Sequence, residues 1–283
     1  METNQPSSSL NIFERINQWI EESITVKLLS IGFLVLILLI PSAWIQDLMQ
    51  ERQLRADGVM QEVSAKWSGS QTISGPILVI PYKVQEKIDR GKDGIEIREY
   101  TQKYFFLPEN LDITGKVTPE VLHRGLFDVA LYNSVLDIKS NFTRPDFAAL
   151  NIADDMVIWK DAYMIFSITD LRGINENLIF NVGDSAKSTE PSSNLGVSVR
   201  KISRYQSETY PDAVTDDNTE FSSSGVVAKL DWKTAEDFNG NTLIKINLKG
   251  SQRLNFVPSG KTTSVNLSGA WNNPSFDGEF LPE

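Results

Sequence analysis

Residues 28–46 read LLSIGFLVLILLIPSAWIQ, a run of 19 residues without a charged side chain. At 1.5 Å per residue this run makes a helix of about 28 Å, close to the thickness of the hydrocarbon core of a bilayer. A cleaved signal peptide is the main alternative. The run exceeds a usual signal-peptide core, however, and bulky Trp44 and Ile45 stand where a small-residue cleavage site would lie. The sequence therefore predicts an uncleaved transmembrane helix over residues 28–46.

The segments on either side of this helix differ in length and pattern. Residues 1–27 form a short tail, polar over residues 1–9, which we expect in the cytoplasm. After the helix, apolar residues recur every three or four positions as far as Trp67, which predicts an amphipathic stalk helix over residues 47–70. Because Lys and Arg lie on both sides of the membrane run, charge alone does not choose an orientation. We expect the long C-terminal part to be exported behind the anchor.

Beyond residue 70 the apolar pattern changes from helical to alternating. Segments rich in β-branched and aromatic residues are bounded by Gly, Pro, Asn or Asp, as strands usually are. They cover residues 76–83, 95–107, 125–132, 162–169, 177–182, 225–232, 242–250 and 262–271. Since no long helical pattern lies between them, residues 71–283 are expected to form an antiparallel β-sandwich-like domain, as one body or two subdomains. The predicted fold class is mainly β.

Local signals refine this prediction. We expect the first strand to open at Gly75 and Pro76 and to end at Pro81 on a sheet edge. Polar stretches at 184–194 and 206–224 predict surface loops, and the second, which is long and acidic, is either a disordered loop or a binding loop. The aromatic residues expected to supply buried area are Phe105, Phe106, Trp159, Phe166, Trp271, Phe276 and Phe280.

Two segments share one order of residues. Residues 105–117 and 255–267 each run through an aromatic residue, a variable residue, a proline, a turn and a strand. This order indicates either a duplicated unit or only the turn grammar that many β proteins use.

The composition excludes several classes of function. The 283 residues carry 27 basic and 37 acidic side chains, a formal charge of −10, so we expect no nucleic acid partner. With no cysteine in the sequence, disulfides, thiol nucleophiles, iron–sulfur clusters and cysteine-ligated zinc sites are ruled out. The common nucleotide, zinc-protease and serine-hydrolase motifs are also absent from the sequence. We expect no cofactor, no metal and no catalytic residue.

The motif TDLRG holds the most catalytic-looking pair. Asp170 and Arg172 place a carboxylate and a guanidinium two residues apart, beside Gly173. A strand-ending turn explains the same residues, because Asp170 can accept backbone N–H groups, Arg172 can pair with a carboxylate and Gly173 can take a positive φ. We therefore expect these three residues to be a structural motif.

Other chemically active residues have similar explanations. The one histidine, His123, is followed by Arg124 and Gly125 before a strand, which indicates a surface or turn role. Carboxylates gather in two groups, Asp154, Asp155 and Asp161 in one and Asp212, Asp216, Asp217 and Glu220 in the other. Paired carboxylates can cleave glycosides or bind calcium, but neither group, nor residues 237–241, has EF-hand spacing. We expect solvated acidic turns.

Residues 34–82, from LVLILLIPSAW to ISGPILVIPY, resemble the opening of the CreD family of bacterial inner-membrane, cell-envelope integrity proteins. Further matches follow in order along the chain, as YFFLPENLDITGKV (104–117), RGLFDVALY (124–132), WKDAYMIFSITDLRGI (159–174) and residues 248–282. Members of the family typically continue into a C-terminal group of transmembrane helices. Because this chain stops at Glu283, we expect it to represent the N-terminal part of such a protein.

The resemblance implies a non-enzymatic inner-membrane protein that displays a periplasmic β-rich domain for envelope integrity, with the lipid bilayer and other envelope or membrane proteins as partners. The alternative is a periplasmic module that senses a peptide, glycan or lipid and signals through the anchor. A third hypothesis is hydrolysis of an envelope glycan by the acidic groups. An apolar pocket with convergent polar groups would favour sensing, whereas two carboxyl groups about 5–10 Å apart across one cleft would favour hydrolysis.

Overall fold

The computed structural model describes residues 24–90, 95–176, 178–197, 199–200, 220–221, 224–271 and 274–276. Most of the tail 1–27 and most of the acidic stretch 206–224, including Asp212, Asp216 and Asp217, lie outside the described residues. The chain divides into two units, Met1–Gly58 and Val59–Glu283, which are taken separately below.

Helix α2 (Ile24–Lys66) begins in the first unit and ends in the second. Within the described part of the chain it is the one helix long and apolar enough to cross a membrane. The apolar side chains of residues 28–46 are exposed, with Leu28 at 66% and Leu38 at 61% of their surface. Apolar surface on this scale is stable against lipid rather than water.

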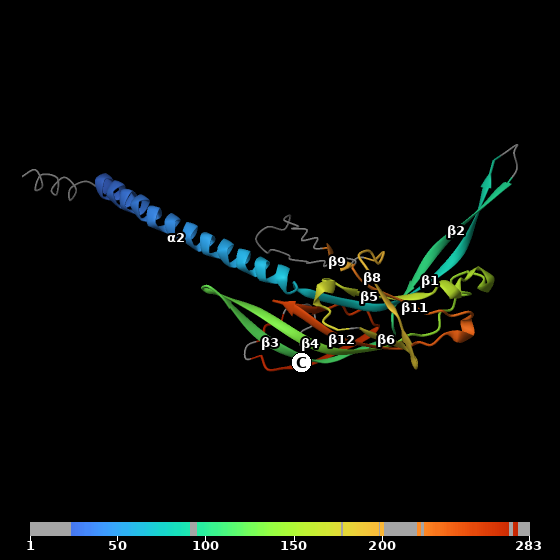
Figure 1. The fold of residues 1–283 in the computed structure, drawn as a ribbon. Helices are drawn as coiled ribbons and strands as arrows, with labels where there is room; N and C mark the ends of the chain where they lie inside the picture. The colour runs from blue at the N-terminus through green and yellow to red at the C-terminus, as the bar shows by residue number, and fades with distance from the viewer. Residues whose placement is uncertain are drawn as a thin grey trace, which may run out of the picture. The chain divides into compact units, whose positions relative to one another are not determined.

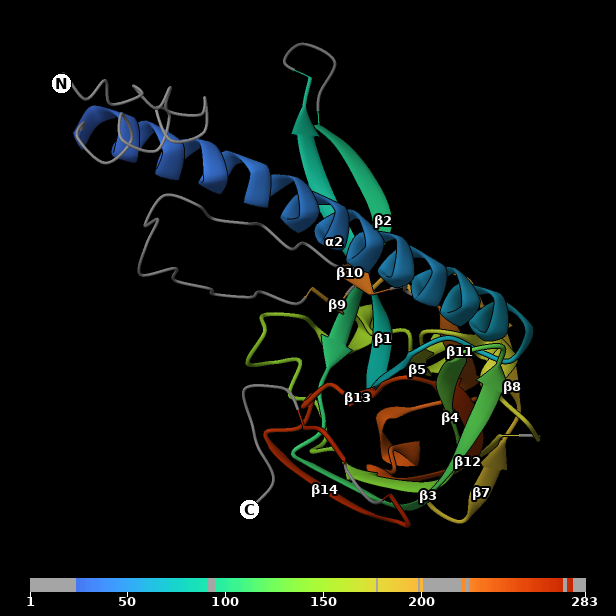
Figure 2. The same cartoon turned by 90° about the vertical axis from the view of Figure 1, so that its left-hand side faces the viewer.

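The β-rich part consists of two six-stranded sheets packed face to face (Figures 1 and 2). Sheet A has the order β13-β1-β5-β11-β8, with β2 also paired to β1, and sheet B has the order β14-β3-β4-β12-β6-β7. The strands of sheet A are β1 (Gln71–Asp89), β2 (Ile95–Phe106), β5 (Tyr163–Ile168), β8 (Thr189–Ser192), β11 (Gly225–Lys229) and β13 (Leu254–Phe256). Those of sheet B are β3 (Asn110–Arg124), β4 (Phe127–Asn141), β6 (Ile179–Val182), β7 (Ser185–Lys187), β12 (Asn241–Ser251) and β14 (Thr262–Gly269). A separate small pair joins β9 (Val199–Arg200) and β10 (Glu220–Phe221).

The core lies between the two sheets and follows the alternation of the strands. Leu78 and Phe166 of sheet A and Ile138 and Ile244 of sheet B are fully buried in one cluster. Each such side chain contributes about 1.5–3 kcal/mol through removal of apolar surface from water. The predicted mainly β fold with an N-terminal apolar helix is therefore confirmed.

Each of the predicted strand segments contains a strand, but several strands were missed. The missed strands are β7, β8, β9, β10 and β13, whereas β3 contains the strand expected within residues 105–117. The expectation that residues 184–194 form a loop is wrong, because β7 pairs with β6 in sheet B and β8 pairs with β11 in sheet A. Both are short strands with half-exposed side chains, so they need no alternating apolar residues.

Two expectations about the first strand are also wrong. Strand β1 begins at Gln71 and contains Gly75 and Pro76, where its register with β5 shifts. It then runs through Pro81, which pairs with Lys103 of β2. The missing N–H of Pro81 costs no ladder bond, because the pairing of β1 with β5 has already ended at Val79.

The aromatic predictions hold only in part. Phe166 and Trp159 are buried, and Phe106 packs against the core. Phe105, Trp271 and Phe276 are exposed to 40%, 37% and 62%, so their predicted burial is wrong, and Phe280 lies outside the described residues. Phe105 alternates with Phe106 on β2 and therefore points to the outer face of sheet A, whereas Trp271 and Phe276 follow the edge strand β14.

The two segments with the shared residue order both cross from sheet A to sheet B. One connects β2 to β3 and the other connects β13 to β14. The crossings lie side by side, since the N–H of Lys261 donates to Pro108 O at 3.0 Å and that of Thr262 to Glu109 O at 2.9 Å. Strands β13 and β14 then pair in parallel with β1 and β3 (Figure 2). The sandwich thus contains two parallel pairs in addition to the antiparallel ones we expected.

Candidate functional site

The end of α2 meets both sheets in a polar junction, made by residues 64–71, 169–173 and 249–253 together with Tyr132. Helix α2 stops at Lys66, and a short link leads to Gln71 at the start of β1. The N–H of Gln71 donates to Arg253 O at 3.0 Å, and the N–H of Ser251 donates to Gly69 O at 3.1 Å. The link is therefore tied to the end of β12 by backbone hydrogen bonds.

Gln71 is the centre of this polar junction. Its side chain is fully buried, and its amide nitrogen lies 2.8 Å from Ser68 Oγ, 2.9 Å from Asp170 O and 3.1 Å from Lys249 O. Its side-chain oxygen accepts the N–H of Asp170 at 3.1 Å. One buried amide thus links the segment after the helix, the turn after β5 and the last residues of strand β12. A buried amide of this kind stabilises a fold only when its donors and acceptors are matched, as they are here.

Asp170 and Arg172 form a bidentate pair at the edge of the polar junction. Arg172 Nε and Nη2 donate to the two carboxylate oxygens at 2.9 and 2.7 Å. The N–H groups of Arg172 and Gly69 donate to the same carboxylate at 3.1 Å each. These hydrogen bonds, led by those of the Arg172 side chain, lower the pKa of Asp170 to about 2. A carboxylate so fully engaged is a poor proton donor or acceptor near neutral pH.

Arg172 also reaches the helix. Its Nη1 donates to the backbone oxygen of Ala65 at 2.7 Å, in the last turn of α2. Carbonyl groups at a helix end have no partner within the helix and carry a partial negative charge, so a guanidinium there is stabilising. The Asp170–Arg172 pair therefore connects the turn after β5 to the C-terminal end of the helix.

Gly173 is required for space and not for a left-handed backbone. The positive φ that we expected is wrong, because the glycines with positive φ among the described residues are Gly75, Gly125, Gly183 and Gly196. A Cβ on Gly173 would instead lie 2.3 Å from Gln71 Nε2 and 2.5 Å from Lys249 O. The absence of a side chain at Gly173 leaves the room that the Gln71 amide occupies.

Further contacts complete the polar junction. Ser64 Oγ of the helix lies 2.8 Å from Ser251 Oγ of β12. The Lys249 ammonium stands 4.9 Å from the centre of the Trp67 ring, a cation–π distance. Tyr132 donates its hydroxyl to Arg253 O at 2.8 Å, and burial raises the pKa of this phenol. The indole N–H of Trp67 is buried and finds no hydrogen-bond partner in the described part of the chain.

An apolar contact beside the polar junction joins the last turns of α2 to the β3–β4 hairpin. Val63 packs with Val129 and Leu131 in a small buried cluster. Glu62 accepts hydrogen bonds from Lys66 at 2.8 Å and from Arg124 at 2.9 Å, which together lower its pKa. Because these pairs are exposed, the apolar cluster contributes more to this contact than the charges do.

The remaining sequence candidates lie away from the polar junction. His123 is exposed on the β3–β4 hairpin, next to Asp128 on the facing strand, and Gly125 forms the turn with a φ of 63°. Asp154 and Asp155 lie exposed in a 3₁₀ turn. Asp237, in the 237–241 segment, accepts the N–H groups of Lys233 and Thr234 as a helix cap. Within the described residues no three acidic or histidine side chains converge in a way that could hold a metal ion.

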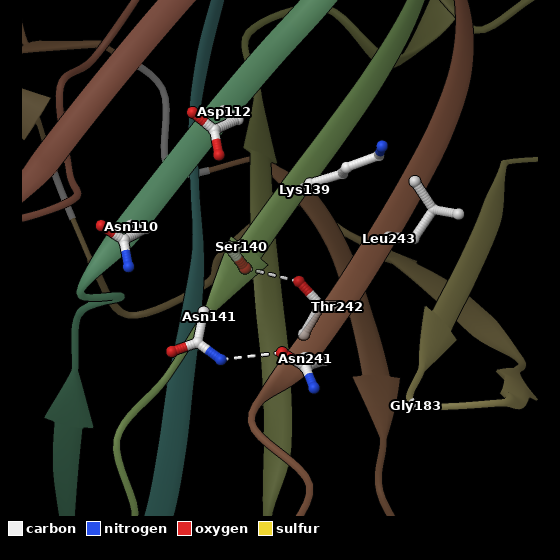
Figure 3. A pocket seen from close by; sticks show the side chains of 9 residues that line it. All are labelled: Asn110, Asp112, Lys139, Ser140, Asn141, Gly183, Asn241, Thr242 and Leu243. Atoms are coloured by element: carbon white, nitrogen blue, oxygen red, sulfur yellow. Dashed lines mark hydrogen bonds between the residues drawn. The ribbon is translucent and has the colours of Figure 1, made fainter.

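The described part of the chain has a surface cavity on each sheet. One, of about 290 Å³, lies at the end of sheet B, where Asn110, Asn141 and Asn241 stand side by side on adjacent strands (Figure 3). Asn141 Nδ2 donates to Asn241 Oδ1 at 2.7 Å. The larger cavity, of about 510 Å³, lies on the outer face of sheet A and is lined by apolar residues, three lysines and Asp161 with Asp231.

Comparison with known proteins gives the family. The sequence model of the family described as inner membrane protein CreD matches residues 23–283, which include the apolar helix and both sheets. This chain belongs to the CreD family. A curated CreD relative, the inner membrane protein CreD of Escherichia coli (strain K12), is 28% identical over 263 residues. That alignment covers 90% of this chain and 51% of the relative, so the chain spans about half the length of the curated CreD protein it matches.

Membership in the CreD family, together with the apolar helix α2, makes this an inner-membrane protein. No solved structure gives a significant match to the chain.

The sequence alone indicates the turn residues of the polar junction but not the strand residues that they contact. TDLRG was singled out, but Gln71, Ser251 and Tyr132 were not, because each is an ordinary residue of a strand until the partner strands are known. A signal was present for Gln71, since a long polar side chain at the start of the apolar-rich strand β1 has to find buried partners. The lysines of the larger cavity come from three separate segments and carried no signal in the sequence.

Proposed function

We propose that this chain is a non-enzymatic membrane-anchored protein that displays its β-sandwich on the periplasmic side of the inner membrane and contributes to the integrity of the cell envelope. The observation that carries the proposal is the polar junction. There the last turns of α2 are joined to both sheets by Gln71, by the Asp170–Arg172 pair and by the Val63 cluster. Contacts that join the end of the anchor helix to the core of the domain suit a protein whose function requires the domain to stay attached to the membrane.

The absence of catalysis is part of the proposal. The most reactive-looking carboxylate, Asp170, already accepts hydrogen bonds on both oxygens, which leaves it little capacity to act on a substrate. Asp154 and Asp155 lie exposed in a short turn, and Asp161 stands beside lysines at the larger cavity. These positions suit solvated or ion-pairing roles.

Topology can be tested in intact cells because the native sequence is free of cysteine. Single cysteines introduced as Ser8→Cys in the tail and Thr101→Cys on exposed β2 would be treated with a membrane-impermeant maleimide. The proposal expects labelling of Thr101→Cys in cells with a permeable outer membrane, and labelling of Ser8→Cys only after lysis. The reverse pattern would place the sandwich in the cytoplasm and end the proposal.

The envelope role needs a test in cells that depend on this protein. Gln71→Ala should raise the uptake of a hydrophobic fluorescent dye, because it loosens the polar junction, whereas Gln85→Ala on the exposed part of β1 should not. Equal amounts of both variants in the membrane must be shown by immunoblot. Dye uptake that stays at the parental level in Gln71→Ala cells would argue against a role for the tethered domain in the envelope.

The larger cavity favours a second candidate function, a binding module coupled to the anchor. Its wall combines buried apolar residues, among them Ala162 and Ile165, with several charged groups, as ligand sites commonly do. Tyr163→Ala enlarges the cavity and should reproduce the envelope defect. Tyr100→Ala, at an exposed position of β2 outside the cavity, should not. Normal envelopes in both would remove this candidate.

A further inference from the structure

We propose that the larger cavity, on the outer face of sheet A, binds an anionic amphiphile, a molecule with one alkyl chain and a phosphate-like or carboxylate headgroup. This inference names the ligand class for the binding module given above as the second candidate function, and it rests on that candidate.

The first support is an apolar strip on a face where a sandwich usually shows polar residues. Ile77 of β1, Ile165 of β5 and Val227 of β11 are neighbours in one row across three strands. In the next row Val79 stands beside Tyr163, and Val79 and Ile165 are almost completely buried although they point away from the main core. The strip forms a second, small hydrophobic cluster of its own.

The second support is that the described residues cover only part of the strip. Leu195 and Val197 pack over it from the segment that follows β8. That segment turns tightly, since Asn194 accepts the N–H of Gly196 at 2.9 Å, and Gly196 has a φ of 71°. Beside Leu195 a cavity of about 510 Å³ remains, with Ala162, Tyr163, Ile165 and Val227 in its wall. This volume falls within the usual range of small-molecule sites, and the wall suits an alkyl chain.

The third support is the charge around the cavity. Three lysines line it, Lys103 from β2, Lys160 from the turn before β5 and Lys229 from β11, against the two carboxylates of Asp161 and Asp231. The lining thus carries one net positive charge, in a chain whose formal charge is −10. Lys160 has no ion-pair partner in the described part of the chain, and the Lys103 ammonium stands 5.6 Å from the centre of the Tyr163 ring.

The remaining lysine is also available. Lys229 pairs with Glu190 at 3.0 Å, but both side chains are 66% exposed, so this pair exchanges for another anion at little cost. An apolar wall with ammonium groups around it matches a ligand that has an alkyl chain and an anionic head. A free inorganic anion would use only the lysines, and a neutral alkyl chain would use only the wall.

The test uses the full chain in nanodiscs of zwitterionic lipid. The probe is dodecyl phosphate with a photoreactive diazirine near the end of its chain, and labelled peptides are identified by mass spectrometry. The inference expects labelling in the peptides that contain Tyr163 and Val227. It also expects the double variant Lys103→Gln, Lys160→Gln to weaken binding about tenfold, since each lysine supplies a charge-assisted contact to the head. The matched variant Lys245→Gln, on the exposed outer face of sheet B, should bind as the parent does.

Competition separates the possible sources of the signal. Unlabelled dodecyl phosphate should displace the probe, whereas inorganic phosphate at the same concentration and dodecylphosphocholine, with a zwitterionic head, should displace it weakly. Equal displacement by inorganic phosphate, or labelling confined to residues 24–46 of the membrane helix, would overturn the inference. If the probe misses the cavity while Tyr163→Ala cells still show an envelope defect, the ligand class is wrong and the binding role stands. If both tests are negative, the binding role fails as well.

Discussion

Gln71 and Asp170 hold each other by two hydrogen bonds in opposite directions. The side-chain amide of Gln71 donates to the backbone oxygen of Asp170 at 2.9 Å, and the backbone N–H of Asp170 donates to the Gln71 side-chain oxygen at 3.1 Å. A side chain from the start of β1 thus replaces a strand partner for the chain where it leaves β5. The pair lies next to the link between the end of α2 and the start of β1. Loss of the pair should therefore weaken both the fold of the sandwich and its contact with the last turn of α2.

The first prediction concerns Gln71 itself. Gln71→Ala should lower the free energy of unfolding by about 2–4 kcal/mol, because it leaves buried groups of Asp170 and Lys249 without partners. Gln71→Glu should be at least as damaging, since a carboxylate cannot donate to the oxygens of Asp170 and Lys249. Urea unfolding of the full chain in detergent, followed by the β-sheet circular dichroism signal, measures this. Exposed Gln85→Ala serves as the control, and an equal effect of both would contradict the prediction.

A second prediction follows from the space beside Gly173. Gly173→Ala should cost about 2–3 kcal/mol, because its Cβ would overlap the Gln71 amide and Lys249 O and force one of them away. Gly69→Ala is the matched control in the same polar junction, since its Cβ would meet Asp170 Oδ2 at an ordinary 3.9 Å. Thermal melting of the two variants decides the point, and similar melting temperatures would mean that the space is not needed.

The third prediction concerns pH. The pKa of Asp170 is lowered from 3.8 to about 2, first by the Arg172 side chain, so its ionised form stabilises the folded state. This contribution is fully present above about pH 4 and is lost as the pH falls through about 2. Comparing the unfolding free energies of the parent and Asp170→Asn from pH 7 to pH 2 should give a difference of about 2 kcal/mol that shrinks below pH 4. A difference that does not change with pH would show that the charge of Asp170 is not what stabilises the turn.

A fourth prediction separates apolar from ionic contacts between α2 and the β3–β4 hairpin. Val63→Ala should destabilise the β-domain by about 2 kcal/mol, because Val63 is 6% exposed and packs on Val129 and Leu131. Arg124→Ala should cost less than about 1 kcal/mol, since its pair with Glu62 is exposed. Val135→Ala, with 58% of Val135 exposed on the same strand β4, provides the reference. A larger effect for Arg124→Ala than for Val63→Ala would contradict this order.

Sequence patterns predicted the long helix and the apolar strands of this fold better than they predicted its short strands and the contacts between distant segments. The run 28–46 and the strands with apolar alternation are local features, so length and period were enough to find them. Strands such as β8 and β13 have short or polar sequences, and they are strands only because partners from distant parts of the chain supply the hydrogen bonds. The predicted end of β1 at Pro81 was wrong for the same reason. Whether the missing N–H of Pro81 breaks a ladder hydrogen bond depends on where the pairing of β1 with β5 ends, and this is not visible in the local sequence.

The candidate site was predicted to the same limited extent. TDLRG was recognisable because Asp, Arg and Gly are turn residues, and the cap by Asp170 follows from that. The reason for Gly173 could not be inferred, since the side chain that fills its space comes from Gln71, about a hundred residues earlier. The lysines of the larger cavity are likewise brought together only by the pairing of β1 with β2 and β5 and of β5 with β11.

The two adjacent crossings, β2 to β3 and β13 to β14, restrict the order in which the strands can pair as the protein folds. The first residues of β1 and β3 have their parallel partners in β13 and β14, near the far end of the sequence. During synthesis those edges stay open until residues 254–269 have left the ribosome, and loop closure over so long a stretch is entropically slow. The edges of β1 and β3 are therefore covered only after the membrane segment has long been available for insertion. A chain that ends shortly before residue 254 would keep its helix and most of its strands, yet it would expose two unpaired edges to any neighbour able to add a strand.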